Sequence, residues 1–378
     1  MLTWGASVLA ITVYSSLPLA GGPDLQHARA VVHGAVLAHE EAGGEAATGV
    51  RYVSLNDGTR GGWAPERAQR NALKVAQDDS AVAYIGDYNS GASSISLPIL
   101  NEAGIPQISP TNAYTGLTRG GRDTQPGDPD RYYPTAVRTY ARIAPTDRAQ
   151  GRALAAAMRE RGCRRVAVLH DGEVFGRAVG LPARRTARRL GLDVVLSDKI
   201  DVVRRRFRAL ARRARHVHAR CVVYTGIAGN GAAELFRAFA RVIPRARLFA
   251  SDGVAERAFM RRRIARRVLV TTYALPPSAL PPEGQAFFRR YATRWGDPTP
   301  DPYAVYGYES MRLVLDAIAA VGPDREAIIR WIHRSVRDRP SPFGTYSIDR
   351  FGDTSLRAYG LFRIRDRQLQ YVETVQAP

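Results

Sequence analysis

Ser90 and Gly91 stand at a position suited to binding an anion. They follow an apolar run, Ala81–Gly86, that is typical of a buried strand, and they precede a helix predicted at residues 93–103. In an open α/β sheet, ligands lie beyond the carboxyl ends of the strands, and a helix start offers unpaired N–H groups to a carboxylate. Ser90 adds a hydroxyl donor, and Gly91 lets the backbone come close. The alternative is that Ser90 only caps the helix.

Two further polar residues follow predicted strands. Thr111 comes after Pro110, just past a short strand, and Asp252 follows the strand that ends at Ala250. In a closed cleft, a carboxylate needs a cationic partner, because an unpaired buried charge is costly. The alternatives are an ordinary Pro-Thr turn at Thr111 and a helix cap or Asx turn at Asp252, before Gly253.

The sequence contains no recognisable catalytic motif. None of its 7 histidines falls in an HExxH motif, and it has neither a GxSxG elbow nor a P-loop. The spacing of its two cysteines, Cys163 and Cys221, fits no metal site. We therefore expect a protein that is not an enzyme and that needs neither a cofactor nor a metal ion.

The net charge of +20 invites a nucleic-acid interpretation, which we discount. Only Lys74 and Lys199 are lysines, so nearly all of the basic charge is arginine, as a codon bias would produce. The sequence shows no zinc-finger spacing, no RNP-like motif and no helix-turn-helix. A solvated surface is the default interpretation of the arginine runs, and an anionic partner surface is the alternative.

The first residues, MLTWGASVLAITVYSSLPLAGG, are mildly apolar but carry no basic residue ahead of the apolar part. They do not form a convincing secretory signal, and no stretch of the sequence approaches the roughly 18 apolar residues that span a bilayer. Either a signal was removed ahead of this sequence or the protein is not exported.

The elements that position these residues alternate between strands and helices. Strands are predicted at residues 10–15, 50–55, 81–86, 106–108, 165–170, 193–197, 221–225, 247–250 and 268–273. Helices are predicted at residues 24–41, 65–77, 93–103, 146–161, 174–190, 204–215, 231–242, 282–295, 302–321 and 324–337. A terminal hairpin is expected from residues 356–365 and 368–375 around Asp366-Arg367. The pattern indicates two α/β blocks with doubly wound parallel sheets.

Two features, one between the predicted blocks and one in the second block, leave alternatives open. Residues 120–134 are rich in Gly, Pro and Asp, so they form either a linker or an ordered surface excursion. Cys163 and Cys221 each precede a strand, and neighbouring strands would place both at one end of a sheet. They form either a disulfide, which suits an oxidising compartment, or two buried thiols.

The sequence resembles the Leu/Ile/Val-binding branch of the type I periplasmic binding proteins, which serves branched-chain amino-acid ABC transporters. The main match is GDYNSGASSISLPILNEAGIPQISPTNAYTGLT at residues 86–118. Others, in the family's order, are SSLPLAGG at 15–22, PGDPDRYYPTAVRTYARIAPTDRAQG at 126–151, VAVLHDGEVFG at 166–176, VVYTG at 222–226, ASDGVAE at 250–256 and YAVYGYESMRLVLDAI at 303–318. The resemblance covers nearly the whole chain.

The resemblance implies an α/β clamp of two doubly wound lobes joined by a hinge of three chain crossings, near Arg142, Tyr273 and Phe343. Lobe 1 would comprise residues 1–142 and 274–342, and lobe 2 would comprise residues 143–273 and 343–378. The family's usual cysteine pair lies in lobe 1, so the resemblance gives no support to a bond between Cys163 and Cys221.

The resemblance also implies roles for the candidate residues. Ser90 and Thr111 would contact the ligand's charged end groups from lobe 1, and Asp252 would pair with an α-ammonium from lobe 2. A family threonine is replaced here by Ala113, so Asn112 or Tyr114 replaces its hydroxyl, or the ligand differs. Phe175 and Ile227 stand at family aromatic positions that pack on the ligand, and core packing is the alternative for either. Two weaker candidates are Leu17, in the first β-α loop that faces the same cleft, and Asn89.

From the resemblance we expect a solute-binding protein of the periplasm or cell surface. It would capture an amino acid or a related metabolite and deliver it to an ABC transporter permease. It would meet the membrane only through that partner or through a lipid anchor ahead of Met1, and it would bind no nucleic acid. The alternative is a receptor or regulator of the same fold that senses an amide or a small organic acid.

Overall fold

The computed structural model describes residues 11–378, in two compact units. The first unit comprises the chain up to Ala113, Gly127–Ala144 and Leu280–Leu356, and the second comprises Tyr114–Pro126, Pro145–Ala279 and Arg357–Pro378. The resemblance predicted that the chain crosses between the lobes near Arg142, Tyr273 and Phe343. In the structure, the chain passes from one unit to the other after Ala144, Ala279 and Leu356. The expected strand residue Ala10, and the start of the apolar segment before it, lie outside the described residues.

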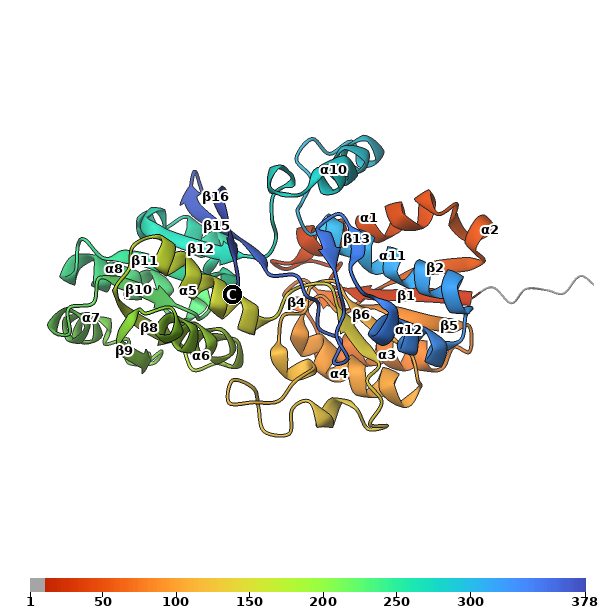
Figure 1. The fold of residues 1–378 in the computed structure, drawn as a ribbon, viewed down its shortest axis with the longest axis horizontal. Helices are drawn as coiled ribbons and strands as arrows, with labels where there is room; N and C mark the ends of the chain where they lie inside the picture. Colours follow the sequence, from red (N-terminus) through yellow and green to blue (C-terminus); the bar gives the residue numbers. More distant parts are fainter. Residues whose placement is uncertain (1–10) are drawn as a thin grey trace, which may run out of the picture. The chain divides into compact units, whose positions relative to one another are not determined.

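The first unit is built on a five-stranded parallel sheet in the order β2-β1-β5-β6-β7 (Figure 1). Its strands are β1 (Ile11–Leu17), β2 (Val50–Asn56), β5 (Ala81–Gly86), β6 (Gln107–Ser109) and β7 (Tyr140–Arg142). The chain crosses back after β2, so the strand order reverses between β1 and β5. In open α/β sheets, the loops that leave the carboxyl ends of two such strands run to opposite faces of the sheet, and ligands bind at this point.

Helices cover both faces of this sheet. The helices of the unit are α1 (Leu25–Glu41), α2 (Gly44–Thr48), α3 (Pro65–Ala76), α4 (Ser90–Glu102), α10 (Pro282–Trp295), α11 (Ala304–Val321) and α12 (Arg325–Ser335). Tyr14 and Tyr84 of the sheet pack with α3 and α4, whereas Leu17 packs with Ala28 and Val31 of α1 on the other face. Successive side chains of a strand point to opposite faces of the sheet, so each face has its own hydrophobic core.

Close helix packing holds α1 against α11. A Cβ atom on Gly34 would overlap the carbonyl oxygen of Ala304, and one on Gly307 would overlap that of Val31. Only glycine at these two positions allows the helix backbones to approach this closely. Two small ribbons, β3 (Gly58–Thr59) with β4 (Gly62–Trp63) and β13 (Arg339–Ser341) with β14 (Gly344–Tyr346), complete the unit with the short 3-10 turn η2 (Asp130–Tyr132).

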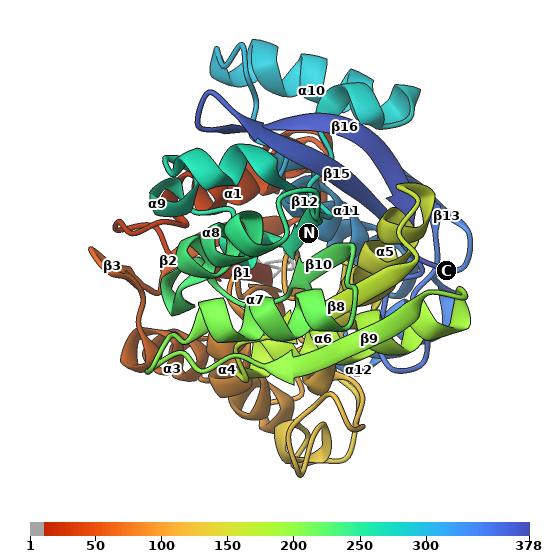
Figure 2. The same cartoon turned by 90° about the vertical axis from the view of Figure 1, so that its left-hand side faces the viewer.

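The second unit is built on a seven-stranded sheet in the order β16-β15-β12-β11-β10-β8-β9 (Figure 2). Its strands are β8 (Arg165–His170), β9 (Asp193–Lys199), β10 (Cys221–Tyr224), β11 (Arg247–Ser251), β12 (Val268–Thr272), β15 (Ala358–Arg365) and β16 (Gln368–Gln376). The first five in sequence are parallel, and β15 and β16 are antiparallel. The predicted hairpin is confirmed: Asp366 and Arg367 both have positive φ, at 50° and 64°, as a type I′ turn requires.

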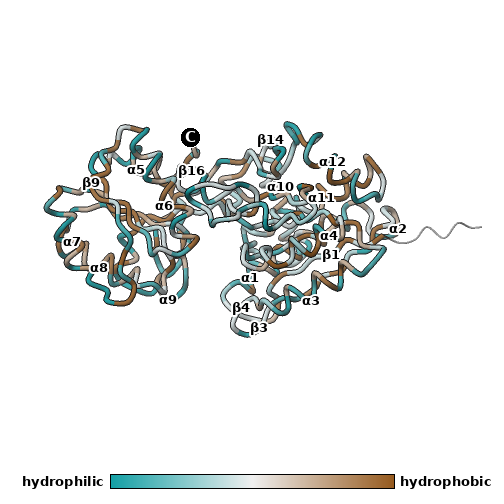
Figure 3. Tube along the Cα trace, turned by 90° about the horizontal axis from the view of Figure 1, so that it is seen from below, coloured by the Kyte–Doolittle hydropathy of each residue, from teal (hydrophilic) through white to brown (hydrophobic). Residues whose placement is uncertain are grey.

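The strands of the second unit alternate between two hydrophobic cores. Its helices are α5 (Asp147–Glu160), α6 (Val174–Arg189), α7 (Phe207–His216), α8 (Ala232–Val242) and α9 (Arg257–Met260), with 3-10 turns η1 (Thr115–Leu117), η3 (Ala228–Asn230), η4 (Asp252–Val254), η5 (Arg263–Arg267) and η6 (Pro277–Ala279). Val166 and Val168 face α5 and α6, whereas Ala167 and Leu169 face α7 and α8. Figure 3 shows these central strands in brown and much of the unit's periphery in teal.

Two helices begin at other residues than predicted, and a third segment takes one of the two forms that the sequence left open. Helix α4 begins at Ser90, three residues before the predicted start. Helix α7 begins at Phe207 rather than Arg204, because the Asp201 carboxylate accepts the N–H groups of Val203 and Arg204 and holds them in a turn. The Gly/Pro/Asp-rich segment is an ordered excursion, since buried Asp123 pairs with Arg148 at 2.6 Å.

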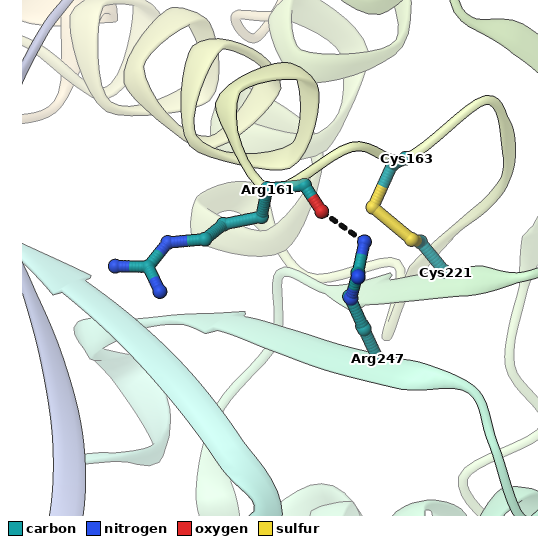
Figure 4. Close-up of a disulfide and its surroundings, with 4 residues drawn as sticks. All are labelled: Arg161, Cys163, Cys221 and Arg247. Carbon is teal, nitrogen blue, oxygen red and sulfur yellow. Dashed lines mark hydrogen bonds between the residues drawn. A yellow bond between two sulfur atoms is a disulfide. The ribbon is translucent and has the colours of Figure 1, made fainter.

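Cys163 and Cys221 form a disulfide in the second unit, with their Cα atoms 5.9 Å apart (Figure 4). Cys221 opens β10, and Cys163 lies in the turn between α5 and β8. Strands β8 and β10 are neighbours, as the sequence predicted, so the two residues meet at one end of the sheet. Beside them, the Arg247 guanidinium donates to the carbonyl oxygen of Arg161. Within residues 11–378, every helix is too short or too polar to cross a bilayer.

Candidate functional site

The reversal of strand order between β1 and β5 places three loops of the first unit at the carboxyl edge of its sheet. One loop follows Leu17, one follows Gly86 and one follows Ser109. The candidates Asn89, Thr111 and Ala113 lie on the second and third of these loops, and Ser90 and Gly91 begin the helix that follows the second. The fold therefore gathers the lobe 1 candidates at one edge.

The start of α4 is the anion-binding feature of this edge. Ser90 is the first residue of the helix, and Asn89 before it makes no side-chain capping bond. The N–H of Gly91 has no acceptor among residues 11–378, as is expected in the first turn of a helix. A Cβ on Gly91 would lie 2.7 Å from Cζ2 of Trp63, so glycine here also lets the indole ring pack on the helix start. The sequence did not indicate this contact.

Asn89 offers an acceptor beside the helix start. Its amide nitrogen donates to Oδ2 of Asp24 at 3.1 Å, while its buried Oδ1 has no partner among the described residues. A buried amide oxygen without a donor is costly, which makes a ligand N–H or O–H group a suitable partner.

Thr111 and Asn112 tie the loop after β6 to the loop after β5. The Thr111 hydroxyl donates to the carbonyl oxygen of Tyr88 at 2.7 Å. The Asn112 amide donates to the carbonyl oxygens of Asp87 and Tyr88, and its Oδ1 accepts a hydrogen bond from the Tyr140 hydroxyl. Asn112 is thereby committed to the protein and is a poor replacement for the hydroxyl that Ala113 lacks.

Fully buried Arg142 supports this loop from below, and the sequence analysis did not identify that role. Its guanidinium donates to the carbonyl oxygen of Asn112 at 3.0 Å and pairs with Asp353 at 3.1 Å. It also lies over the ring of Tyr140, with Cζ 5.3 Å from the ring centroid. The hydrogen bond to Asn112 ties Arg142 to the loop that carries Thr111 and Ala113, and the contacts with Asp353 and Tyr140 hold Arg142 in place.

Leu17 and Tyr114 are accounted for by packing. Leu17 is fully buried against α1. Tyr114 belongs to the second unit, where its buried hydroxyl accepts the N–H of Gln125 at 3.0 Å. The proposed site therefore includes neither residue.

Two carboxyl groups, Asp57 and Asp87, are fully buried at this edge of the sheet. Asp87 accepts hydrogen bonds from the hydroxyls of Tyr84, Ser93 and Ser96. Asp57 accepts one from Ser16 at 3.4 Å, and its Oδ1 has no partner among the described residues. Burial, with the neighbouring Asp87 charge, raises the pKa of Asp57 to about 8, and burial raises that of Asp87 to about 6. The sequence did not reveal this pair.

The second unit repeats the same topology, with its strand order reversing between β8 and β10. Phe175 is the second residue of α6, which follows β8, and Ile227, 39% exposed, follows β10. Buried Asp171 joins their loops: Oδ1 accepts the N–H of Glu173, and Oδ2 accepts the N–H of Ile227 and the Asn230 amide. Asp171 therefore holds these two loops together at the point where the strand order reverses.

Phe175 lies against the loop that carries Asp252. A Cβ on Gly253 would lie 2.6 Å from Cε1 of Phe175 and 2.8 Å from the carbonyl oxygen of Gly226. The loops after β8, β10 and β11 therefore converge, and the three lobe 2 candidates, Phe175, Ile227 and Asp252, come together.

Asp252 is the first residue of η4, directly after β11. Its Oδ1 accepts a hydrogen bond from Nε2 of Gln150 at 2.9 Å, and no arginine or lysine among residues 11–378 pairs with it. Burial raises its pKa to about 6, against the opposing hydrogen bonds from Gln150, its own backbone, Gly253 and Thr272. The carboxylate is positioned by neutral donors and keeps its charge uncompensated.

Metal ligation has no support in this arrangement. Across residues 11–378, no group of three or more His, Cys, Asp or Glu side chains is placed to hold a metal ion. The polar groups at both sheet edges are hydroxyls, amides, helix N–H groups and carboxyl groups. Such groups suit reversible hydrogen bonding and charge pairing with a small polar molecule.

Two doubly wound α/β units in one chain, each with polar loops at its strand-order reversal, define the class of two-lobed solute-binding proteins. The family model described as periplasmic binding protein matches residues 16–368, so the chain belongs to that family. The predicted family resemblance and the predicted α/β fold class are confirmed.

Individual relatives are distant but match over most of their length. An amino acid binding protein of Pseudomonas aeruginosa is 25% identical over 342 residues, covering 86% of this chain and 82% of that protein. A leucine binding protein of Thermotoga maritima has a TM-score of 0.73 at 23% identity, covering 97% of this chain and 99% of that one. A solute binding protein from Rhodopseudomonas palustris HaA2, in complex with p-hydroxybenzoic acid, has a TM-score of 0.73 at 17% identity, covering 97% of each chain.

Proposed function

We propose that this protein captures a small amino acid, or a closely related amino-carboxylate, between its two lobes and delivers it to an ABC transporter permease. The observation that carries the proposal is Asp252. Its carboxylate is held by Gln150 and has no cationic partner among the described residues, so an ammonium group on the ligand would complete it.

Recognition of the other end of the ligand is assigned to the first unit. A ligand carboxylate would accept hydrogen bonds from the N–H of Gly91 and from the Ser90 hydroxyl at the start of α4. Asn89 would add an acceptor through its unpartnered Oδ1. Phe175 and Ile227 would supply apolar surface to the ligand side chain.

Ligand capture would proceed by hinge closure. The ligand would bind the first lobe and then be covered by Asp252 and Phe175 of the second lobe. Moving a clamp from mostly open to mostly closed takes about 5.5 kcal/mol of differential affinity. Recognition of both charged ends within a dry cleft is the source of that difference in affinity.

An amino-carboxylate is favoured over an aromatic acid by the charge at Asp252. The Rhodopseudomonas relative is in complex with p-hydroxybenzoic acid, which has a carboxylate and no ammonium group. Such a ligand would leave the Asp252 charge unpaired in a closed cleft, at a cost in affinity.

We place the protein outside the cytoplasm. Membership of the periplasmic binding protein family supports this location, as does the disulfide between Cys163 and Cys221. The permease is the proposed partner, and the protein's role is transport without a chemical step.

The test is a thermal-shift screen against amino acids, their amides and aromatic acids, followed by calorimetry with the best ligand. A ligand that binds only the folded state adds about 2.7 kcal/mol of stability at one hundred times its Kd. We expect a shift with a group of amino acids, and Asp252→Asn should weaken their binding at least about 30-fold.

The matched control is Asp193→Asn, which removes a half-exposed carboxylate of the same unit. Surface ion pairs contribute little, so this variant should bind as the wild type does. Equal affinity in Asp252→Asn and wild type would exclude the ammonium role. A shift with aromatic acids alone would keep the clamp and replace the ligand class.

A further inference from the structure

The second unit carries a surface hollow that the proposed amino-acid site does not use. Its volume is about 280 Å³, and its walls come from the segment around α9 and η5 and from the turn of the terminal hairpin. The lining residues are Met260, Arg261, Arg262, Arg263, Arg266, Ile364, Asp366 and Arg367.

Positive charge is concentrated around this hollow. Five of its lining side chains are arginines, all of them exposed, and Asp366 is the one acid among the eight. None of these five arginines forms an ion pair with a residue in the described part of the chain. The hollow therefore has a surplus of four positive charges, counted as five arginines less one aspartate.

The arrangement of these arginines sets the hollow apart, because the fold gathers them around one concave surface. Around the hollow the arginines come from two segments, residues 261–266 and residue 367, that the fold brings together. Buried Ile364 and partly buried Met260 add apolar surface to the lining. Apolar lining lowers the local dielectric constant, which strengthens the attraction between the arginines and an anion held there.

We infer that this hollow binds a phosphate group, carried either by a free phosphate anion or by the headgroup of an anionic lipid. Guanidinium groups bind phosphate oxygens in pairs of parallel hydrogen bonds, and several converging arginines match a group with several charged oxygens. The hollow has room for one phosphate group with part of its substituent or hydration shell. This site does not rest on the proposed amino-acid function.

The experiment compares three forms of the full chain. The test variant is Arg262→Gln/Arg266→Gln, which removes two arginines of the hollow. The matched control is Arg188→Gln/Arg189→Gln, which removes two exposed arginines from the end of α6 in the same unit. Each form is titrated with inorganic phosphate by calorimetry at low ionic strength. Each is also sedimented with vesicles of phosphatidylglycerol and of phosphatidylcholine.

We expect the test variant to lose at least tenfold in affinity, while the control stays within about twofold, and we expect salt to weaken binding. Binding of inorganic phosphate identifies a free-anion site, and binding to phosphatidylglycerol vesicles alone identifies a headgroup site. Equal losses of affinity in the two variants would show that binding responds only to net charge, and this would overturn the proposed phosphate site. Absence of binding to both probes would overturn it as well.

Discussion

Gln150 holds Asp252 with a single amide group: its Nε2 lies 2.9 Å from Oδ1 of Asp252 and 2.9 Å from the carbonyl oxygen of Thr271. Three elements, α5, β12 and η4, are thereby fixed to one another. A neutral amide orients the carboxylate without cancelling its charge. The charge remains available for a cation that comes from outside the protein.

Gln150→Leu should weaken binding of an amino acid by about tenfold. The substitution removes a hydrogen bond to a charged group, which contributes about 1.5–3 kcal/mol, and leaves the Asp252 carboxylate free to reorient. Calorimetry at a temperature where the variant is fully folded measures this effect. Gln285→Leu is the control, because it removes a comparable amide–carbonyl bond, to Leu280, in the first unit. Equal affinities for the two variants would contradict the positioning role of Gln150.

Ligand binding should depend on pH through Asp252. Its pKa is raised to about 6, so below that pH the free protein holds the protonated, neutral form. An ammonium ligand favours the ionised form and lowers this pKa on binding. Affinity should therefore be constant above about pH 7. Below about pH 6 it should decrease as the pH is lowered, and the decrease should approach tenfold per pH unit.

Calorimetry from pH 5 to 7.5 in two buffers of different ionisation enthalpy checks this, since binding near pH 6 should release a proton. The affinity of the Asp252→Asn variant for the ligand should not change with pH over the same range. A wild-type profile that is equally flat would show that the carboxylate does not meet the ligand cation.

Stability of the first unit should decrease as pH rises, because of Asp57. Its folded-state pKa is raised to about 8 from the ordinary value of 3.8. A raised carboxyl pKa means that the folded state keeps its proton while the unfolded chain ionises. The contribution to stability is complete below about pH 4 and is lost progressively as pH rises towards 8, amounting to a few kcal/mol.

Tryptophan fluorescence reports this transition, because the second unit contains none of the chain's 4 tryptophans, and Trp63, Trp295 and Trp331 belong to the first unit. Asp57→Asn should flatten the decline between pH 5 and 8 and raise the melting temperature at pH 8. Asp79→Asn, which removes an exposed carboxylate of the same unit, is the control. A wild-type melting temperature that rises from pH 5 to 8 would contradict the assignment.

The sequence predicted the repeating strands and helices well, because their apolar periodicity is strong. It missed β7, where fully buried Arg142 interrupts the apolar pattern. A charged residue in a strand usually indicates exposure. The burial of Arg142 is stabilised by contacts such as those with Asp353 and with the carbonyl oxygen of Asn112, which are distant in the sequence. The ribbons β3–β4 and β13–β14 are two or three residues long, too short for any periodicity.

The candidate site was predicted in part for a similar reason. Strand ends are visible in the sequence, so Ser90, Thr111 and Asp252 could be placed on loops at sheet edges. The residues that hold these candidates in position lie on other helices and strands, far from the candidates in the sequence. Gln150 is 102 residues from Asp252, and no local pattern links the two.

Loss of the disulfide should destabilise the second unit and spare the first. The bond closes a loop with a sequence separation of 58 residues, and such bonds typically contribute about 2–4 kcal/mol by restricting the unfolded chain. In Cys163→Ser/Cys221→Ser, calorimetry should show an earlier transition for the second unit. The tryptophan fluorescence transition of the first unit should stay where it is. A reducing agent should reproduce the shift in the wild type and leave the double variant unchanged. Equal shifts of the tryptophan and calorimetric transitions would show instead that the two units unfold as one.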